Sequence, residues 1–199
     1  GYIKYLASGE LEGRGLGSVG LEKAGQMIAD LFRSAGLEPA GENGTFFQTW
    51  QTPVGPEQKP VTLRNVVGMI RGKNVGLQDQ AVVLCAHYDH LGNSFTGADD
   101  NASGVAVMLE LAQALGKNLK PERSILFIGF TGEESGLLGS AFFVDQLKGG
   151  RLPLFKTVSA VINLDTVGRL PEGGKLMVIG GSSAREWRFI FMGIGYTVG

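Results

Sequence analysis

Three apolar segments of this sequence each run directly into ionisable side chains. The segments are AVVLCA (81–86), SILFIGFTG (124–132) and VSAVINL (158–164). The ionisable residues are His87, Asp89 and His90 after the first segment, Asp99 and Asp100 in the loop that follows, Glu133 and Glu134 after the second segment, and Asp165 after the third. Because α/β sheets bind ligands at the carboxyl ends of their strands, we expect these side chains to gather in one crevice.

Each of these residues alone has an ordinary structural explanation. An aspartate after a strand is commonly a helix cap, and a Glu-Glu pair at a helix start interacts favourably with the helix dipole. A histidine after a strand is often only a hydrogen-bonded loop residue. Together they would place several carboxylates and at least one imidazole in a single crevice. That much negative charge is costly unless a cation offsets it.

The types of side chain indicate which cation this is. Imidazole and carboxylate ligands together suit zinc, cobalt or manganese, whereas calcium and magnesium prefer oxygen ligands alone. The single cysteine, Cys85, lies inside an apolar segment, so we expect a buried small hydrophobe and no structural thiolate site. An open zinc site with carboxylate ligands is typical of hydrolysis by a metal-activated water, with an adjacent glutamate as the general base.

The surrounding sequence alternates between predicted strands and helices. Helical spacing of apolar residues predicts helices over 21–36, 105–115, 136–147 and 184–192. Continuous apolar runs predict buried strands over 81–85, 124–130, 158–164 and 176–179. Residues 38–60 read as a loop with short edge strands, followed by a strand over 62–70. The alternation predicts βαβ units and an α/β sandwich with a mostly parallel central sheet.

The composition excludes several other classes of protein. With 199 residues, 43% of them apolar, the chain fits one globular domain, and its one cysteine allows no intrachain disulfide. A net charge of −1 gives no electrostatic reason to bind nucleic acid or an anionic membrane surface. No apolar run reaches the roughly 18 residues of a transmembrane helix. Glycine is in excess, at 32 residues, and we expect it in close backbone approaches around the site.

Five segments of the sequence resemble the M28 family of zinc peptidases, the co-catalytic zinc aminopeptidases. They are ELEGRGLGSVG (10–20), AHYDHLG (86–92), GADDNASG (97–104), GFTGEESGLLGS (129–140) and NLDTVGR (163–169). The resemblance covers essentially the whole chain. It implies a three-layer α/β/α sandwich of the zinc exopeptidase type, two zinc ions, peptide substrates and hydrolysis at the free N-terminus of a peptide.

The resemblance implies four metal ligands. His87, Asp100 and Asp165 correspond to the ligands of one zinc ion, and Asp100 also bridges to the second ion. Glu134 corresponds to a ligand of that second ion. Asp99 competes with Asp100 for the bridging role, and we prefer Asp100 because it directly precedes Asn-Ala-Ser-Gly.

Two further residues acquire roles from the resemblance. Glu133 corresponds to the general base, which takes a proton from the zinc-activated water and passes it to the leaving amine. Asp89 corresponds to the carboxylate that orients the imidazole of His87, as expected for a ligating histidine that donates its other N–H group.

The sequence departs from the family pattern in its histidines. The family supplies a further histidine ligand well beyond the position of Asp165, whereas this chain has only His87 and His90 and ends at residue 199. The zinc ion between Asp100 and Glu134 therefore lacks its histidine, and we expect His90 to line the substrate cleft instead of replacing it. We interpret residues 1–199 as a single M28-like domain that is incomplete at its C-terminus, or whose second metal site is impaired.

Alternative functions follow from the same observations. One is a carboxypeptidase-like or glutaminyl cyclase-like member of the same superfamily, and another is an inactive or one-metal fragment. The G-x-G-x-x-G pattern at residues 15–20 follows no apolar strand, so we expect a glycine-rich loop near the cleft and no dinucleotide site. The habit of the family and the non-Met first residue predict a secreted or cell-envelope protein, and the sequence makes no prediction of the oligomeric state.

Overall fold

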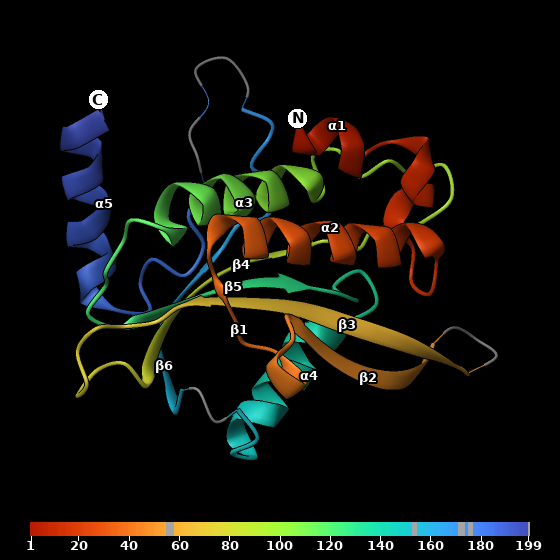
Figure 1. The fold of residues 1–199 in the computed structure, drawn as a ribbon. Coiled ribbons are helices and arrows are strands. Elements are labelled where there is room, and N and C mark those ends of the chain that lie inside the picture. Colours follow the sequence, from red (N-terminus) through yellow and green to blue (C-terminus); the bar gives the residue numbers. More distant parts are fainter. Residues whose placement is uncertain (55–57, 153–154, 171–173, 175–176, 199) are drawn as a thin grey trace. The chain divides into compact units, whose positions relative to one another are not determined.

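The computed structural model describes residues 1–54, 58–152, 155–170, 174 and 177–198 (Figure 1). Contacts divide the chain into two compact units, Gly1–Gly168 and Arg169–Gly199. The first unit contains α1 (Tyr2–Leu6), η1 (Gly9–Arg14), α2 (Val19–Ala35), β1 (Glu38–Pro39), η2 (Glu42–Gly44), β2 (Phe47–Val54), β3 (Lys59–Ile70), β4 (Gln80–His87), α3 (Ala102–Gly116), β5 (Ser124–Phe130), α4 (Leu138–Lys148) and β6 (Thr157–Asn163). The second unit contains α5 (Arg185–Val198).

The sheet has six strands in the order β1-β3-β5-β4-β6, with β2 paired to β3. β4 is parallel to both β5 and β6, and β3 is antiparallel to β1, β2 and β5. Among the described strands, β3 is therefore the only one with reversed direction, which confirms a mostly parallel sheet. β2 is a full strand that pairs along β3, where the sequence predicts only short edge strands within a loop.

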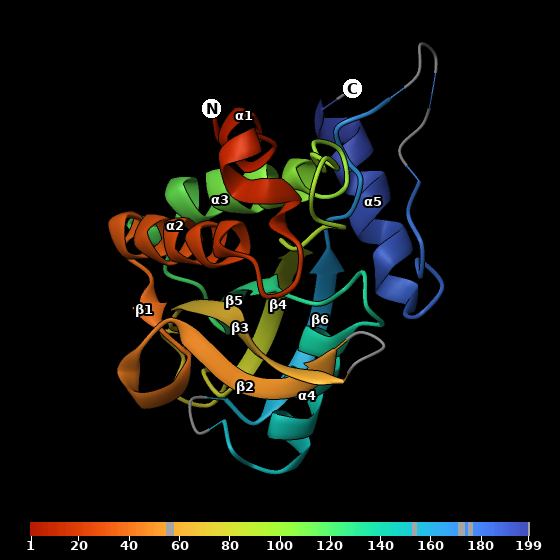
Figure 2. The same ribbon diagram turned by 90° about the vertical axis from the view of Figure 1, so that its right-hand side faces the viewer.

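Helices cover both faces of the sheet (Figures 1 and 2). α1, α2 and α3 lie on one face, and α4 lies on the other. Neighbouring residues of β5 enter different cores: Phe127 packs beneath α2 and α3, whereas Leu126 packs with Phe143 of α4. Burial on both faces explains why the strands read as continuous apolar runs, and it confirms the three-layer arrangement.

The ends of α2 show why the sequence folds into a helix there. Ser18 is the N-terminal cap, and its hydroxyl accepts the backbone N–H of Leu21 at 3.0 Å. Gly36 ends the helix in the left-handed conformation, with φ of 84°, as the sequence predicts. On the apolar side of the helix, Ile28 and Phe32 are fully buried.

Two of the predicted buried strands differ from the structure, the first in its burial and the second in its presence. The segment over 158–164 forms β6, but it is largely exposed: Val161 and Ile162 are 52% and 40% exposed. β6 pairs only with β4 in the described part of the chain, so it is an edge strand. A fourth strand over 176–179 is not seen: Leu176 lies outside the described residues, and residues 177–179 are exposed coil and turn without a partner strand among those described. An apolar run becomes a strand only where a neighbouring strand satisfies its backbone.

The second unit, described by itself, contains the helix predicted over 184–192, which extends to Val198. The rings of Trp187 and Phe191 stack on one side of α5, 6.0 Å apart. In the described ranges, no helix combines the length and the apolar character that crossing a lipid bilayer requires.

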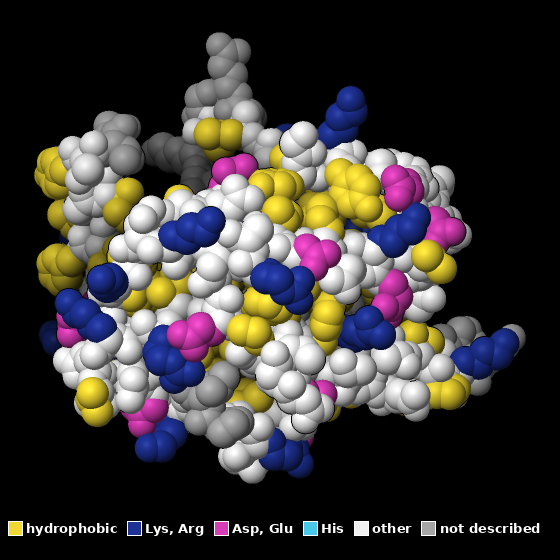
Figure 3. All heavy atoms as spheres, viewed as in Figure 1, with side chains coloured by type: hydrophobic (Ala, Val, Ile, Leu, Met, Phe, Trp, Pro, Cys, Tyr) yellow, Lys and Arg dark blue, Asp and Glu magenta, His cyan; other side chains and the backbone are white. Residues whose placement is uncertain are grey.

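The face over α2 and α3 carries charges of both signs (Figure 3). Its ion pairs include Lys23 Nζ with Glu10 Oε1 at 3.1 Å and Arg33 Nη1 with Asp30 Oδ1 at 2.6 Å. Basic and acidic side chains are interspersed, so this face has no extended area of a single sign.

Candidate metal centre

The predicted site residues lie at the carboxyl ends of three adjacent parallel strands. β4 lies between β5 and β6, and His87 at its end is level with Phe130 at the end of β5. The N–H of Tyr88 then continues this pairing by donating to the carbonyl of Phe130 at 2.9 Å. Glu133 and Glu134 follow β5, and Asp165 follows β6, so three loops converge at one edge of the sheet.

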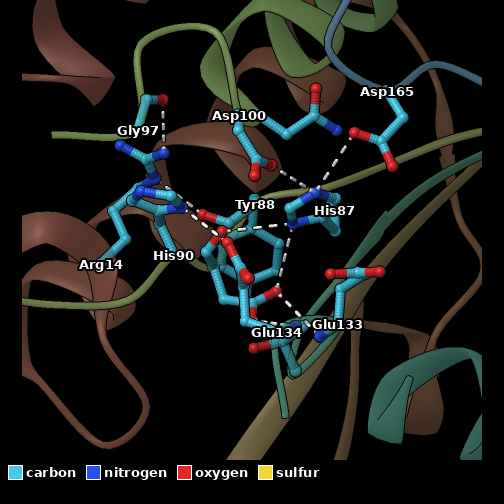
Figure 4. Close-up of polar contacts among 12 residues, drawn as sticks. Arg14, His87, Tyr88, His90, Gly97, Asp100, Glu133, Glu134 and Asp165 are labelled. Carbon is cyan, nitrogen blue, oxygen red and sulfur yellow. Dashed lines mark hydrogen bonds and ion pairs between the residues drawn. The ribbon is translucent and has the colours of Figure 1, made fainter. Parts of the chain in front are cut away.

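A first group of possible metal ligands consists of His87, Asp100 and Asp165 (Figure 4). His87 Nε2 lies 3.1 Å from Asp100 Oδ1 and 3.6 Å from Asp165 Oδ1. The imidazole is 3% exposed, whereas the two carboxylates are 45% and 40% exposed. The group is thus built on a buried histidine and opens to solvent through its carboxylates.

A second group consists of His90, Asp100 and Glu134. His90 Nδ1 lies 2.7 Å from Glu134 Oε1, and both side chains are mostly buried. Asp100 belongs to both groups, and Asp99 belongs to neither within the described residues. The sequence alone assigned His90 to the substrate cleft, so its place beside Glu134 is a feature that sequence reasoning missed.

The negative charges of the site favour the protonated form of the His87 imidazole. Burial tends to lower the pKa of His87, but the contact with Asp89 and the charges of the nearby carboxylates outweigh it and raise this pKa to about 9. The pKa of the half-buried Glu133 is also raised, because burial and the charges of Asp165, Glu134 and Asp89 outweigh the effect of His87.

The donor set of the first group fits a zinc ion. His87 Nδ1 lies 3.2 Å from the backbone carbonyl of Asp89, which assigns a hydrogen to Nδ1 and leaves the lone pair of Nε2 for a ligand. Three lone-pair donors, this nitrogen and the oxygens of Asp100 and Asp165, then face one another. Such an arrangement is unfavourable without a positive charge between them. A proton on Nε2 supplies this charge in the metal-free protein, in keeping with the raised pKa of His87, and a metal ion supplies it when it displaces that proton. The mixed nitrogen and oxygen donors suit zinc.

The loops of Asp100 and Asp165 are held together by hydrogen bonds around Asn101. The Asn101 side chain donates to the carbonyl of Leu164 at 2.9 Å and accepts the N–H groups of Gly104 at 3.0 Å and Thr166 at 3.2 Å. It thus caps α3 and fixes the end of β6 with the same amide group. Sequence reasoning missed this role, although an asparagine directly before a predicted helix is a readable cap signal.

Asp89 lies beneath the site and is fully buried. Its two carboxylate oxygens accept the backbone N–H groups of Glu133 at 3.2 Å and Glu134 at 3.4 Å. The carboxylate oxygen Oδ1 of Asp89 lies 3.7 Å from His87 Nδ1. The backbone carbonyl oxygen of Asp89 is closer to the same nitrogen, at 3.2 Å. The carboxylate therefore fixes the Glu133–Glu134 turn in addition to facing the imidazole.

Replacing Asp89 by asparagine is expected to destabilise the metal-free protein by about 1–3 kcal/mol. One amide oxygen cannot accept both N–H groups as the carboxylate does, so a buried donor loses its partner. Urea unfolding in chelator measures the change. The matched control is Asp145→Asn on the exposed surface of α4, where the ion pair with Arg151 is worth little. Equal effects of the two substitutions would contradict the role assigned to Asp89.

A small cavity of about 230 Å³ adjoins the first group. His87 and Glu133 lie at its polar side, and Phe130, Leu137 and Val161 contribute apolar walls. Cys85 also lines it, but the thiol is 3% exposed and burial raises its pKa to about 12, in agreement with the predicted buried hydrophobe.

Comparison with known proteins gives three findings. The profile of Peptidase family M28 matches residues 65–191. Aminopeptidase YwaD of Bacillus subtilis (strain 168) is 43% identical over 107 residues, which are 54% of this chain and 22% of YwaD. Probable zinc metalloprotease Lema_P086240 of Leptosphaeria maculans is 31% identical over 150 residues, which are 71% of this chain and 33% of the relative. The chain thus spans a third or less of the length of these relatives.

A solved structure of similar fold is the glutaminyl cyclase of Fimbriiglobus ruber. It superposes with a TM-score of 0.64 over 82% of this chain and 59% of the cyclase, at 20% sequence identity. At that identity the similarity concerns the fold alone.

Proposed function

This chain belongs to peptidase family M28, and from that premise we propose that it hydrolyses peptides from their free N-terminus with the help of zinc. The observation that carries the proposal is the convergence of His87, Asp100 and Asp165 beside Glu133, a glutamate outside both ligand groups. The name of the relative YwaD supports the aminopeptidase activity, and the name of the Leptosphaeria maculans relative supports zinc.

We propose that two zinc ions share Asp100. His87, Asp100 and Asp165 would hold one ion, and Asp100 and Glu134 would hold the other, with His90 as the imidazole nearest to Glu134. The chemistry that zinc supplies at such a site is polarisation of the scissile carbonyl and acidification of a water molecule.

Glu133 is the proposed general base and acid. Glu133 lines the cavity together with His87, where its carboxylate can accept a proton from the attacking water and return it to the leaving amine. The raised pKa of Glu133 supports this role, because a carboxyl group exchanges protons better when its pKa approaches the working pH. Asp89 is the proposed positioning residue, since it binds the backbone of Glu133 and faces His87.

Activity is expected to depend on the metal and on a free amino group. Chelation should abolish the hydrolysis of an aminoacyl chromogenic substrate, and added zinc should restore it, because water is not acidified without the ion. The N-acetylated form of the same substrate should be cleaved at least about tenfold more slowly, because the exposed carboxylates of the site attract the free ammonium group.

Further substrates test the alternative functions. Efficient cleavage of the N-acetylated chromogenic substrate would contradict the aminopeptidase. Release of the last residue from an N-acetylated peptide with a free C-terminal carboxylate would support a carboxypeptidase-like enzyme. Cyclisation of peptides that begin with glutamine would support the glutaminyl cyclase alternative, for which the comparison supplies a shared fold only. No turnover together with one bound metal ion would support the one-metal fragment.

A further inference from the structure

Arg14 is fully buried, although it comes from a polar, glycine-rich segment. Its guanidinium donates to four backbone carbonyls. Nε donates to Tyr88 at 2.8 Å, Nη1 to Thr96 at 3.0 Å and to Leu6, and Nη2 to Gly97 at 2.9 Å. Three of these carbonyls belong to residues 88–97, the irregular loop between His87 and Asp100 (Figure 4).

The backbone around Arg14 contacts the same loop directly. The N–H of His90 donates to the carbonyl of Arg14 at 3.1 Å, and the N–H of Gly92 donates to the carbonyl of Gly13 at 3.0 Å. The approach is so close that a Cβ atom on Gly13 or Gly15 would lie 2.7 Å or 2.8 Å from backbone atoms of Gly92. Only glycine at these two positions allows the two backbones to touch.

The segment adopts a strained conformation where it meets the loop. Glu12 and Arg14 both have φ of 50°, in the left-handed region that non-glycine residues rarely adopt. Such strain persists only where surrounding contacts fix the backbone, and it concentrates near functional sites. Glu12 is fixed from the other side as well, because its carboxylate accepts the N–H of Gly20 at the start of α2 at 3.2 Å.

We propose that residues 12–15, which we call the N-terminal clamp, position the loop of residues 88–97. Arg14, at the centre of the clamp, is the positioning residue. The proposal rests on the proposed function for the role of the loop, which carries His90 and leads to Asp100. Beyond the contact of Tyr88 with Phe130, residues 88–97 form no strand, so their carbonyls need other donors. The five donors of one guanidinium supply them in a fixed geometry.

The charge of Arg14 supports the same role. Burial lowers the pKa of Arg14, and the carboxylates of Asp89 and Asp100 oppose this lowering. The guanidinium therefore lies where it offsets part of the negative charge that the site concentrates. Its contacts are to backbone carbonyls, so it acts on these carboxylates through its charge and not by binding them.

Gly15→Ala tests the clamp without removing Arg14. Gly15 has φ of −66°, which alanine adopts without strain, so the only cost of the new methyl group is its approach to Gly92. The matched control is Gly9→Ala in the same segment, because a Cβ atom at Gly9 meets nothing within 4 Å. Arg14→Lys is the second variant. It keeps the charge but loses the planar fork that reaches several carbonyls at once.

Amide hydrogen exchange and cobalt affinity, both measured on the full chain, test the clamp. In metal-free protein, amide hydrogen exchange at His90 and Gly92 should become about three- to tenfold faster in Gly15→Ala and Arg14→Lys, while the amides of β5 stay unchanged. The affinity for cobalt, used as a spectroscopic probe of the ligand groups, should fall about 10- to 100-fold with a changed visible spectrum. Gly9→Ala should match the parent in both measurements.

Parent-like exchange at His90 and Gly92, or parent-like cobalt affinity in the folded variants, would overturn the proposal. So would a Gly15→Ala protein that fails to fold while Gly9→Ala folds, because the segment would then serve the whole fold and not this loop. A parent chain that bound no cobalt would refute the proposed function, while the exchange measurement would still decide the contact between clamp and loop.

Discussion

Replacing Glu133 by glutamine is expected to lower kcat by about 10²–10⁴-fold and to leave the metal content unchanged. Glutamine keeps the shape of the side chain but cannot accept a proton. Glu133 belongs to neither of the described ligand groups, so both should still bind metal. Its backbone N–H, which donates to Asp89, is also unaffected by the substitution. The measurement is steady-state hydrolysis of an aminoacyl substrate together with elemental analysis of the same preparation.

The control for this prediction is Glu110→Gln. Glu110 is exposed on α3 and takes no part in the site, so the variant should retain parent activity. An active Glu133→Gln enzyme would refute the role of general base. An inactive enzyme that had also lost metal would instead assign Glu133 to the ligands.

Replacing Asp100 by alanine is expected to weaken both metal sites by more than about 100-fold, which exceeds the loss typical of indirect partners of a metal. The reason is that Asp100 offers its carboxylate to both ligand groups. Asp165→Ala and Glu134→Ala should each weaken only one site, because each residue belongs to one group. Counting zinc per chain by elemental analysis should therefore give two ions for the parent, one for each of these two variants, and none for Asp100→Ala.

Asp99→Asn is the matched control for Asp100. Asp99 precedes it directly, and its carboxylate accepts the N–H of Gly168 at 3.0 Å, a contact that the amide oxygen of asparagine can keep. This variant should retain both ions. One ion left in Asp100→Ala would show that the two groups do not share this ligand. One ion in the parent would support the one-metal alternative.

The apolar pattern predicts the central strands well because they are covered on both faces. β5 occupies the predicted residues 124–130, and its alternate side chains enter two different cores. The same pattern predicts the strand over 158–164 correctly but not its exposure, because β6 lies at an edge of the described part of the sheet. Apolar composition reports that a segment can be buried, and only the arrangement of the neighbouring strands decides whether it is.

The sequence also determined which loops form the site. Each of β4, β5 and β6 is an apolar run that ends in ionisable residues, and parallel strands bring such ends to one edge. His87 and Asp165 meet there for this reason. The match over 65–191 confirms the family resemblance, and that resemblance is the source of the proposed zinc peptidase chemistry.

Only the tertiary structure decided how side chains within those loops are oriented. It directs Asp100, which the family resemblance favours, toward both ligand groups, and it brings His90 to Glu134. The physical reason is that an irregular loop has no repeat to set the direction of its side chains. Here partners distant in the chain set that direction, including Asn101 with Leu164, 63 residues away, and Arg14 with Gly97, 83 residues away. Hydrogen bonds over such separations leave no periodic signal in the sequence.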